Sequence, residues 1–310
     1  MMQKRLMTAD PALSPKIPWA PLAWFTVLVL ACDAPVVVPL VRQWAWDDDM
    51  GHGFFVPVIA AYIAWQRRHE LLAITPKPNW WGLVVALWGC LQVVVGTLGV
   101  ELFTARTAVV ITVIGLIWFL CGTEILRKLA FPLFLLFFMV PIPAVIYTQI
   151  TFPLQIFASR LADFALTVLG IPVLREGNIL ELPSGPLSVV EACSGIRSLL
   201  SLTFLSLVYG YLFEKQTWRR VVIFLATIPV ALIANGGRVT LTGVLSQISP
   251  DLAHGFFHES TGMATFFAAA VMLFLLHQAL LVPSRIAAHR RVKAVSRQPS
   301  AVNHTDSADR

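Results

Sequence analysis

Charged residues are scarce in this chain of 310 residues. Asp, Glu, Lys and Arg make up 13% of the sequence, whereas a soluble globular domain carries about 25%. The hydrophobic fraction is 57% and the mean hydropathy is +0.75. The apolar residues fall in several runs of about 17 to 25 residues, which is long enough to cross a bilayer. This composition excludes a soluble enzyme and predicts an all-α polytopic membrane protein.

Cysteine is also rare. The chain has four cysteines, with no Cys-x-x-Cys pair and no zinc-ligand spacing. A disulfide framework is therefore not expected. No His, Asp or Glu cluster has a metal-ligand spacing either, so no metal or organic cofactor is expected. Cys32, Cys90 and Cys121 lie in apolar runs, where a thiol packs as a small hydrophobe. Cys193 lies in a polar, glycine-containing segment, which makes it the candidate for chemistry.

Hydropathy predicts eight membrane spans. Their expected ranges are 20–41, 53–66, 80–100, 105–122, 128–147, 195–213, 220–237 and 262–282. The segment 153–170 carries a polar residue at every fourth position, which fits a helix lying at the membrane interface better than a span. Between residues 176 and 191, a Pro-Ser-Gly-Pro turn separates two short extended arms, 178–182 and 187–190, and predicts a small hairpin.

The basic residues predict the orientation. With eight spans and a cytoplasmic N-terminus, 17 of the 23 lysines and arginines fall in cytoplasmic segments, in agreement with the positive-inside bias. A ninth span at 153–170 would invert the rest of the chain and place the basic tail outside. The net charge of +6 is thus interpreted as topology, and nucleic acid is not an expected partner.

Three segments follow from this topology. Residues 1–19 are expected to be a cytoplasmic N-terminal segment, 20–282 a single transmembrane domain, and 283–310 a basic, disordered cytoplasmic tail. The interfacial helix, the hairpin and the acidic stretch Asp47 to Asp49 are expected at the outer face. A substrate tail could enter beside these aspartates, although a solvated loop without substrate contact is the simpler interpretation.

Cys193 lies immediately before the span expected at 195–213. At a helix start, unpaired backbone N–H groups and the helix dipole favour an anion and lower the pKa of a thiol from about 8.5. This position suits a nucleophilic cysteine. A small residue packed at a helix start is the alternative interpretation, and the cysteine by itself does not decide between them.

Two further polar segments are expected at the same face as Cys193. Arg238 follows Asn235-Gly236-Gly237 at the outer end of the seventh span, and an arginine near bilayer depth is a functional candidate. The alternative is a simple helix end whose arginine reaches the headgroups. His258 precedes the last span and can transfer protons near neutral pH. A thiol, a cation and an imidazole are the parts that acyl transfer needs.

These blocks resemble the signature regions of the exosortase/archaeosortase family of membrane transpeptidases. The similar segments are His52–Pro57, Glu191–Arg197, Asn235–Arg238 and His258–Gly262. The resemblance runs from about residue 44 to residue 282. It implies an active site made of Cys193, Arg238 and His258, with His254, four residues earlier, as the alternative histidine. Supporting or substrate-binding roles are expected for Glu191, Ser194, Asn235, His52 and His254.

The resemblance also implies the substrates. They are exported membrane proteins whose C-terminal sorting signal combines a short Pro-Glu-Pro-like motif, one membrane helix and a basic end. Cleavage through a thioester is expected at the periplasmic face of the bacterial inner membrane, in connection with exopolysaccharide production. The expected partners are these proteins and the lipid bilayer.

Two other classes of protein fit a polytopic chain of this kind. A transporter or flippase of a lipid-linked saccharide would use Arg238 and the Asp47–Asp49 stretch to contact a headgroup, with Cys193 inert. A scaffold of an envelope polysaccharide machine would need none of the three candidate residues.

Overall fold

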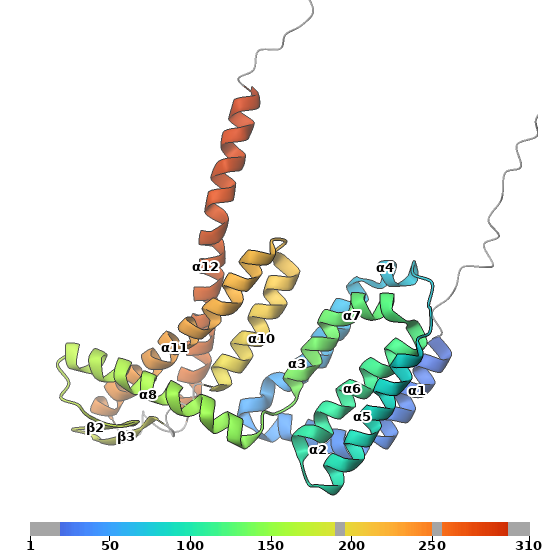
Figure 1. Ribbon diagram of the computed structural model, residues 1–310. Helices are drawn as coiled ribbons and strands as arrows, with labels where there is room; N and C mark the ends of the chain where they lie inside the picture. Colours follow the sequence, from blue (N-terminus) through green and yellow to red (C-terminus); the bar gives the residue numbers. More distant parts are fainter. Residues whose placement is uncertain (1–18, 190–195, 250–255, 297–310) are drawn as a thin grey trace, which may run out of the picture. The chain divides into compact units, whose positions relative to one another are not determined.

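The computed structural model describes residues 19–189, 196–249 and 256–296 (Figure 1). The chain forms two compact units, one up to Phe152 and one from Pro153 onward. Each unit is described by itself.

The first unit consists of helices. Its elements are α1 (Trp19–Cys32), α2 (Ala34–Trp46), the 3-10 helix η2 (Asp48–Phe54), α3 (Phe55–Gln66), α4 (Arg68–Leu72), α5 (Trp80–Leu98), α6 (Leu102–Cys121), α7 (Thr123–Leu135), the 3-10 helix η3 (Leu136–Met139) and the first turns of α8 (Ala144–Val168). The predicted first span is divided between α1 and α2, which meet at 77° around Asp33.

Helices α5 and α6 pack against each other through glycine. Gly82, Gly89 and Gly96 recur every seven residues along α5, and all three are buried. A side-chain carbon added at Gly89 would collide with Thr112, and one added at Gly96 would lie 2.7 Å from the backbone nitrogen of Ala105. Small residues let helix backbones approach closely in a membrane, where water does not drive helices together. The two helices therefore form a close-packed hairpin of two spans.

The break before α8 differs from the prediction. The fifth span was expected to reach residue 147, but the helical run ends before Pro141, and the predicted interfacial helix at 153–170 is the second half of α8. Pro153 lies inside that helix. Pro141 and Pro143 cause the break, because proline offers no N–H and forces the preceding residue out of helical conformation. The helical run 123–139 and α8 meet at 85°.

The second unit combines helices with a small sheet. Its elements are the rest of α8, β1 (Leu174–Glu176), β2 (Ile179–Leu182), β3 (Gly185–Ser188), α10 (Ile196–Phe213), α11 (Thr217–Ile248) and α12 (Phe256–Ser296). The predicted hairpin is present as β2 and β3, which pair antiparallel with Leu182 opposite Gly185. Strand β1 was not predicted. It adds to β2 through a tight turn at Gly177, whose φ of 65° suits glycine.

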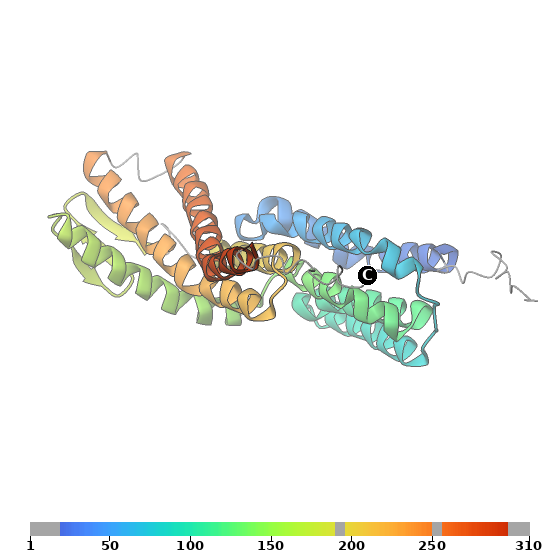
Figure 2. The same cartoon turned by 90° about the horizontal axis from the view of Figure 1, so that it is seen from above.

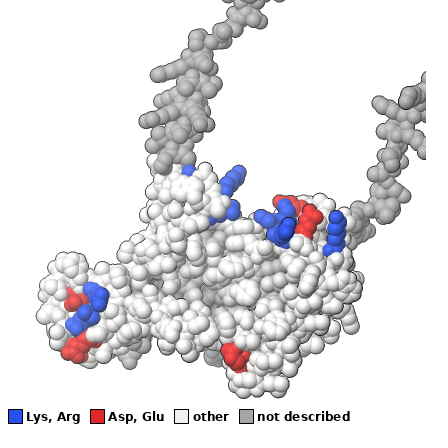
Figure 3. Space-filling model, in the orientation of Figure 1, with Lys and Arg blue, Asp and Glu red and all other residues white. Residues whose placement is uncertain are grey.

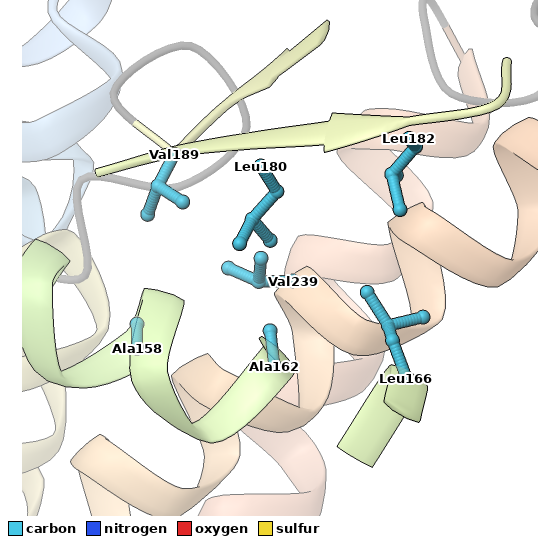
Figure 4. Packing of buried hydrophobic residues seen from close by; sticks show 7 residues of the cluster. All are labelled: Ala158, Ala162, Leu166, Leu180, Leu182, Val189 and Val239. Carbon is cyan, nitrogen blue, oxygen red and sulfur yellow. The ribbon is translucent and has the colours of Figure 1, made fainter. Parts of the chain in front are cut away.

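The sheet packs on α8 and on the second half of α11 (Figure 4). The buried residues of this core are Ala158, Ala162, Leu166, Leu180, Leu182, Val189 and Val239. The face of α8 that packs inward is therefore built mainly from small side chains. Phe157 and Phe164 on its other side are exposed. A helix that buries small residues and exposes phenylalanine favours contact with lipid, as predicted for an interfacial helix.

Helix α11 continues past its predicted end at residue 237 and runs to Ile248. Its 32 residues correspond to about 48 Å at 1.5 Å per residue, whereas the hydrocarbon core of a bilayer is about 30 Å thick. The last turns of α11 pack against α8 and the sheet. Gly243 lies against Leu166, and the Ser246 and Ser184 hydroxyl oxygens are 3.0 Å apart. The Asn-Gly-Gly-Arg segment thus lies inside a helix, so its interpretation as a helix end is wrong.

Helices α10, α11 and α12 share an apolar core. It is formed by Leu202 of α10, Val230 and Ala231 of α11, and Ala269 and Leu273 of α12. Helix α12 continues to Ser296, beyond the predicted end of the span at 282 and into the segment expected to be disordered. Alanine, arginine and lysine are frequent there and have high helix propensity, so the lack of apolar periodicity did not prevent a helix.

The architecture is that of an all-α polytopic membrane protein. Among the described residues, four helices are long and apolar enough to cross a membrane singly, and counting each of two bent pairs as one span gives six. The expected number of eight stays a prediction, because α3 and α10 are shorter. On the face shown in Figure 3, charged side chains gather in small groups, and the wide areas between them carry no charge.

Candidate active site

Arg238 of α11 and Gly262 of α12 are in contact. A side-chain carbon built on Gly262 would lie 3.1 Å from Cζ and Nη2 of Arg238 and 3.3 Å from its Nη1. The guanidinium group therefore rests against the backbone of α12 at the one residue that has no side chain. This contact joins two of the sequence blocks, the one at Asn235–Arg238 and the one at His258–Gly262.

The packing of α11 explains why Arg238 faces α12. Gly236, Val239 and Gly243 lie three and four residues apart, so they share one face of the helix. That face packs on α8 and the sheet, with Gly236 against Leu161 and Val239 in the buried core. Arg238 lies on another side of the helix. Figure 2 shows α11 between α8 and α12. The contact with Gly262 places Arg238 on the side of α11 that faces α12.

His258 lies in the first turn of α12, which begins at Phe256. It precedes Gly262 by four residues, and residues four apart lie above one another on the same helix face. The backbone of His258 is therefore on the face of α12 that receives Arg238. The side chain of His258 lies outside the described residues, as do Glu191, Cys193, Ser194 and His254 entirely. The proposed grouping of the thiol with Arg238 stays a prediction.

Asn235 is buried one helical turn before Arg238. It lines a small notch whose other lining residues are Leu154, Leu199, Ala231 and Leu232. The notch lies between α8, α10 and α11, and Asn235 supplies its polar side chain. The supporting role expected for Asn235 stays a prediction.

His52 belongs to the first unit, where it joins η2 to η3. Its Nε2 atom lies 3.1 Å from the carbonyl oxygen of Phe138. Since a carbonyl only accepts hydrogen bonds, Nε2 carries the proton. Burial lowers the pKa of His52, which favours the neutral ring. Next to it, Trp44 donates from Nε1 to the carbonyl oxygen of Met139 at 2.9 Å. His52 thus has a packing role in its own unit, and its expected support of the active site stays a prediction.

Two of the acidic residues at the start of η2 accept internal hydrogen bonds. Asp47 accepts from Nε2 of Gln43 at 2.9 Å and from the backbone nitrogen of Asp49 at 3.0 Å. Asp49 accepts from the hydroxyl of Tyr147 at 2.7 Å. These bonds tie the acidic stretch to α2 and to the first turns of α8, so it is part of the packing of the first unit.

A second polar cluster, not expected from the sequence, lies at the N-terminal end of α11. Glu214, Arg219 and His277 are exposed by only 5%, 7% and 4%. The Oε2 atom of Glu214 lies 3.4 Å from Nη1 of Arg219 and 3.1 Å from Nε2 of His277. The hydroxyl of Tyr209 is 2.6 Å from Nδ1 of His277. The sequence signal was weak, because each residue is a single polar position beside an apolar run.

The distance along α11 between Arg219 and Arg238 is close to the thickness of a bilayer core. Arg219 and Arg238 lie on the same helix, and nineteen residues at 1.5 Å each give about 28 Å, close to the 30 Å or so of the hydrocarbon core. The expected position of Arg238 at the outer membrane boundary stays a prediction. In the part of the chain that the structure describes, no three His, Cys, Asp or Glu residues are grouped to hold a metal ion.

The fold and this geometry define a class: a polytopic α-helical membrane protein with an arginine of one helix packed against a glycine of the next. The family model of the transmembrane exosortases matches residues 44–275. The chain belongs to that family, and the match includes every block that carried the resemblance. No curated protein and no solved structure matches the chain. As a family, exosortases are cysteine-type membrane transpeptidases.

Proposed function

We propose that this chain is a cysteine transpeptidase that cleaves the C-terminal sorting signal of exported membrane proteins. The observation that carries the proposal is the contact of Arg238 with Gly262. It joins the arginine block, inside α11, to the histidine block in the first turns of α12, and the proposed chemistry requires a cation and a proton-transferring residue. Family membership supports the transpeptidase class.

In the proposed reaction, the Cys193 thiolate attacks the carbonyl carbon of the scissile peptide bond. Arg238 stabilises the thiolate or the oxyanion that develops on the carbonyl oxygen. The C–N bond then breaks, and His258 gives its proton to the leaving amine, which leaves a thioester on Cys193. An acceptor amine or water attacks the thioester and loses a proton to His258, and the C–S bond breaks to release the Cys193 thiolate, which restores the starting state.

The proposed substrate class follows from the family resemblance. It comprises proteins with a Pro-Glu-Pro-like motif, a membrane helix and a basic end, and their sorting accompanies exopolysaccharide production. The proposed topology has both termini in the cytoplasm and Arg238 at the periplasmic boundary. The separation of Arg238 from the Glu214 cluster by one bilayer thickness supports a site at a membrane surface.

Trapping the covalent intermediate tests the proposal directly. The purified chain, mixed with a substrate that carries a sorting signal, should form a thioester adduct that hydroxylamine releases. Cys193→Ala should form none, and Cys90→Ala is the matched control because Cys90 is an exposed thiol in an apolar helix. A Cys193→Ala variant that processes substrate normally would contradict the proposal and favour the transporter or the scaffold.

The histidine assignment needs its own pair of variants. His258→Ala should lower the processing rate by about 10²- to 10⁴-fold, the usual contribution of general acid–base catalysis. His254→Ala should have a smaller effect. If His254→Ala abolishes processing and an equally expressed His258→Ala does not, His254 is the proton-transferring residue.

A further inference from the structure

We propose that Gly262 is a positioning residue: it provides a flat seat on α12 against which the guanidinium group of Arg238 is held. The inference rests on the proposed function, since it assigns a second residue to the placing of the active-site cation. Gly262 lies one helical turn from His258 on the same face of α12. The seat therefore also sets the spacing between the arginine and the turn that carries the histidine.

The three distances at this contact describe how the guanidinium group lies. The position of a carbon added at Gly262 is almost equally far from Cζ, Nη1 and Nη2 of Arg238, at 3.1 to 3.3 Å. A point in the plane of the group, facing the fork of the two nitrogens, would be clearly farther from Cζ than from either nitrogen. The added carbon would therefore lie over the face of the guanidinium group.

This orientation fixes the direction in which the hydrogen-bond donors of Arg238 point. The five N–H donors of arginine lie in the guanidinium plane, so packing one face against α12 directs them along the helix surface. Arginine has a long side chain with many rotamers. Contact of one face with a fixed backbone reduces that freedom before substrate binds, which is how positioning lowers a reaction barrier.

Only glycine allows this contact without moving the arginine. Carbon atoms pack at about 3.5 to 4.0 Å, so a methyl group at Gly262 would push the guanidinium group away by a few tenths of an ångström, and a leucine side chain would push it farther. Displacement of a catalytic group by about 1 Å can lower a rate 10²-fold. The helix itself would tolerate the change, because alanine and leucine are better helix formers than glycine.

The test compares Gly262→Ala and Gly262→Leu with a matched control in the full-length protein. Gly210→Ala on α10 is the control, because the nearest atoms to its added carbon lie at an ordinary 3.8 Å. Processing of a sorting-signal substrate is measured in single turnover with enzyme in excess. We expect Gly262→Ala to be about tenfold slower and Gly262→Leu about 10²-fold slower, with Gly210→Ala like the wild type and all variants equally stable to heating.

A double-mutant cycle separates positioning from a general packing role. In an Arg238→Lys background, Gly262→Ala should cause little further loss, because an ammonium group has no planar face to seat. Equal losses in both backgrounds would overturn the proposal, and so would full activity of Gly262→Leu. Cys193→Ala is measured in parallel. If Cys193→Ala is active, the proposed function is wrong. If Cys193→Ala is inactive and the Gly262 variants are as active as the wild type, only the positioning role of Gly262 is wrong.

Discussion

Replacing Glu214 should destabilise the second unit strongly. Glu214 lies in the turn between α10 and α11, and its carboxylate accepts hydrogen bonds from the backbone nitrogens of Lys215 and Gln216 at 2.7 and 2.8 Å. Its other oxygen contacts Arg219 and His277. Three helices therefore meet at one buried carboxylate, because His277 belongs to α12.

The loss of stability depends on the charge that stays buried when the Glu214 side chain is shortened. Glu214→Ala removes the partner of Arg219, whose side chain is only 8% exposed. Breaking a buried ion pair by removing one partner costs about 3 to 5 kcal/mol, because the remaining charge stays buried without compensation. Glu214→Gln keeps the shape and an oxygen that accepts from the two backbone nitrogens, so it should cost about half as much. The Nε2–H of His277 also loses its charged acceptor in both variants.

The same carboxylate makes stability depend on pH. Burial by itself raises the pKa of Glu214, but hydrogen bonds from Gln216, His277, Lys215 and Arg219 outweigh it and lower the pKa from 4.5 to about 2. Because the folded-state pKa lies below the unfolded-state value, the stabilisation is present above about pH 4.5 and is lost as the pH falls towards 2. Glu214→Gln should remove this acid-dependent loss.

The assay is thermal unfolding of the purified protein in detergent micelles, between pH 3 and pH 7. Glu70→Gln is the matched control, because its ion pair with Lys128 at 2.9 Å is 56% exposed on the glutamate side, and exposed pairs contribute about 0 to 1 kcal/mol. Glu214→Ala should unfold at a much lower temperature than Glu70→Gln at pH 7. Equal unfolding temperatures for the two variants would refute the reasoning.

Three further predictions concern topology and packing. A reporter inserted at Ser184 should be periplasmic and one fused after Pro283 cytoplasmic; an outside tail would contradict the predicted orientation. Asp49→Asn should weaken the bond from Tyr147 and cost about 1 kcal/mol in thermal unfolding, with substrate processing unchanged; a loss of processing at normal stability would instead indicate substrate contact. Gly89→Leu should separate α5 from α6 and lower the yield of folded protein, as judged by protease resistance, because its side chain would collide with α6; unchanged resistance would show that the glycine spacing is not needed.

Much of the fold could be predicted from the sequence. Hydropathy indicated a membrane protein, and a helix lies over each predicted span. The hairpin followed from Pro-Ser-Gly-Pro between two short arms. These features depend on local composition and on the cost of exposing apolar surface or unpaired backbone groups, so a single stretch of sequence is enough to reveal them. The order of the Cys, Arg and His blocks also indicated the family.

Element ends were decided by the tertiary structure. Asn235-Gly236-Gly237-Arg238 has the composition of a helix end, yet α11 continues for several turns. Its glycines allow close approach, since Gly236 packs on Leu161, and packing of the later turns against α8 and the sheet outweighs the low helix propensity of glycine. The helix breaks at Pro141 and Pro143 and continues through Pro153, and the turns of α8 that follow Pro153 pack against the sheet.

In the candidate site, too, some features could be predicted from the sequence and others depend on the tertiary structure. Arg238 and His258 were recognised by residue type and by their place beside apolar runs, which are properties of the sequence. The seat at Gly262 depends on which face of α11 turns towards α12, and α8 and the sheet decide this by occupying the opposite face. Glu214 and His277 are 63 residues apart, and only helix packing brings them together. Local chemistry thus determined which residues are candidates, and long-range packing determined which of them meet.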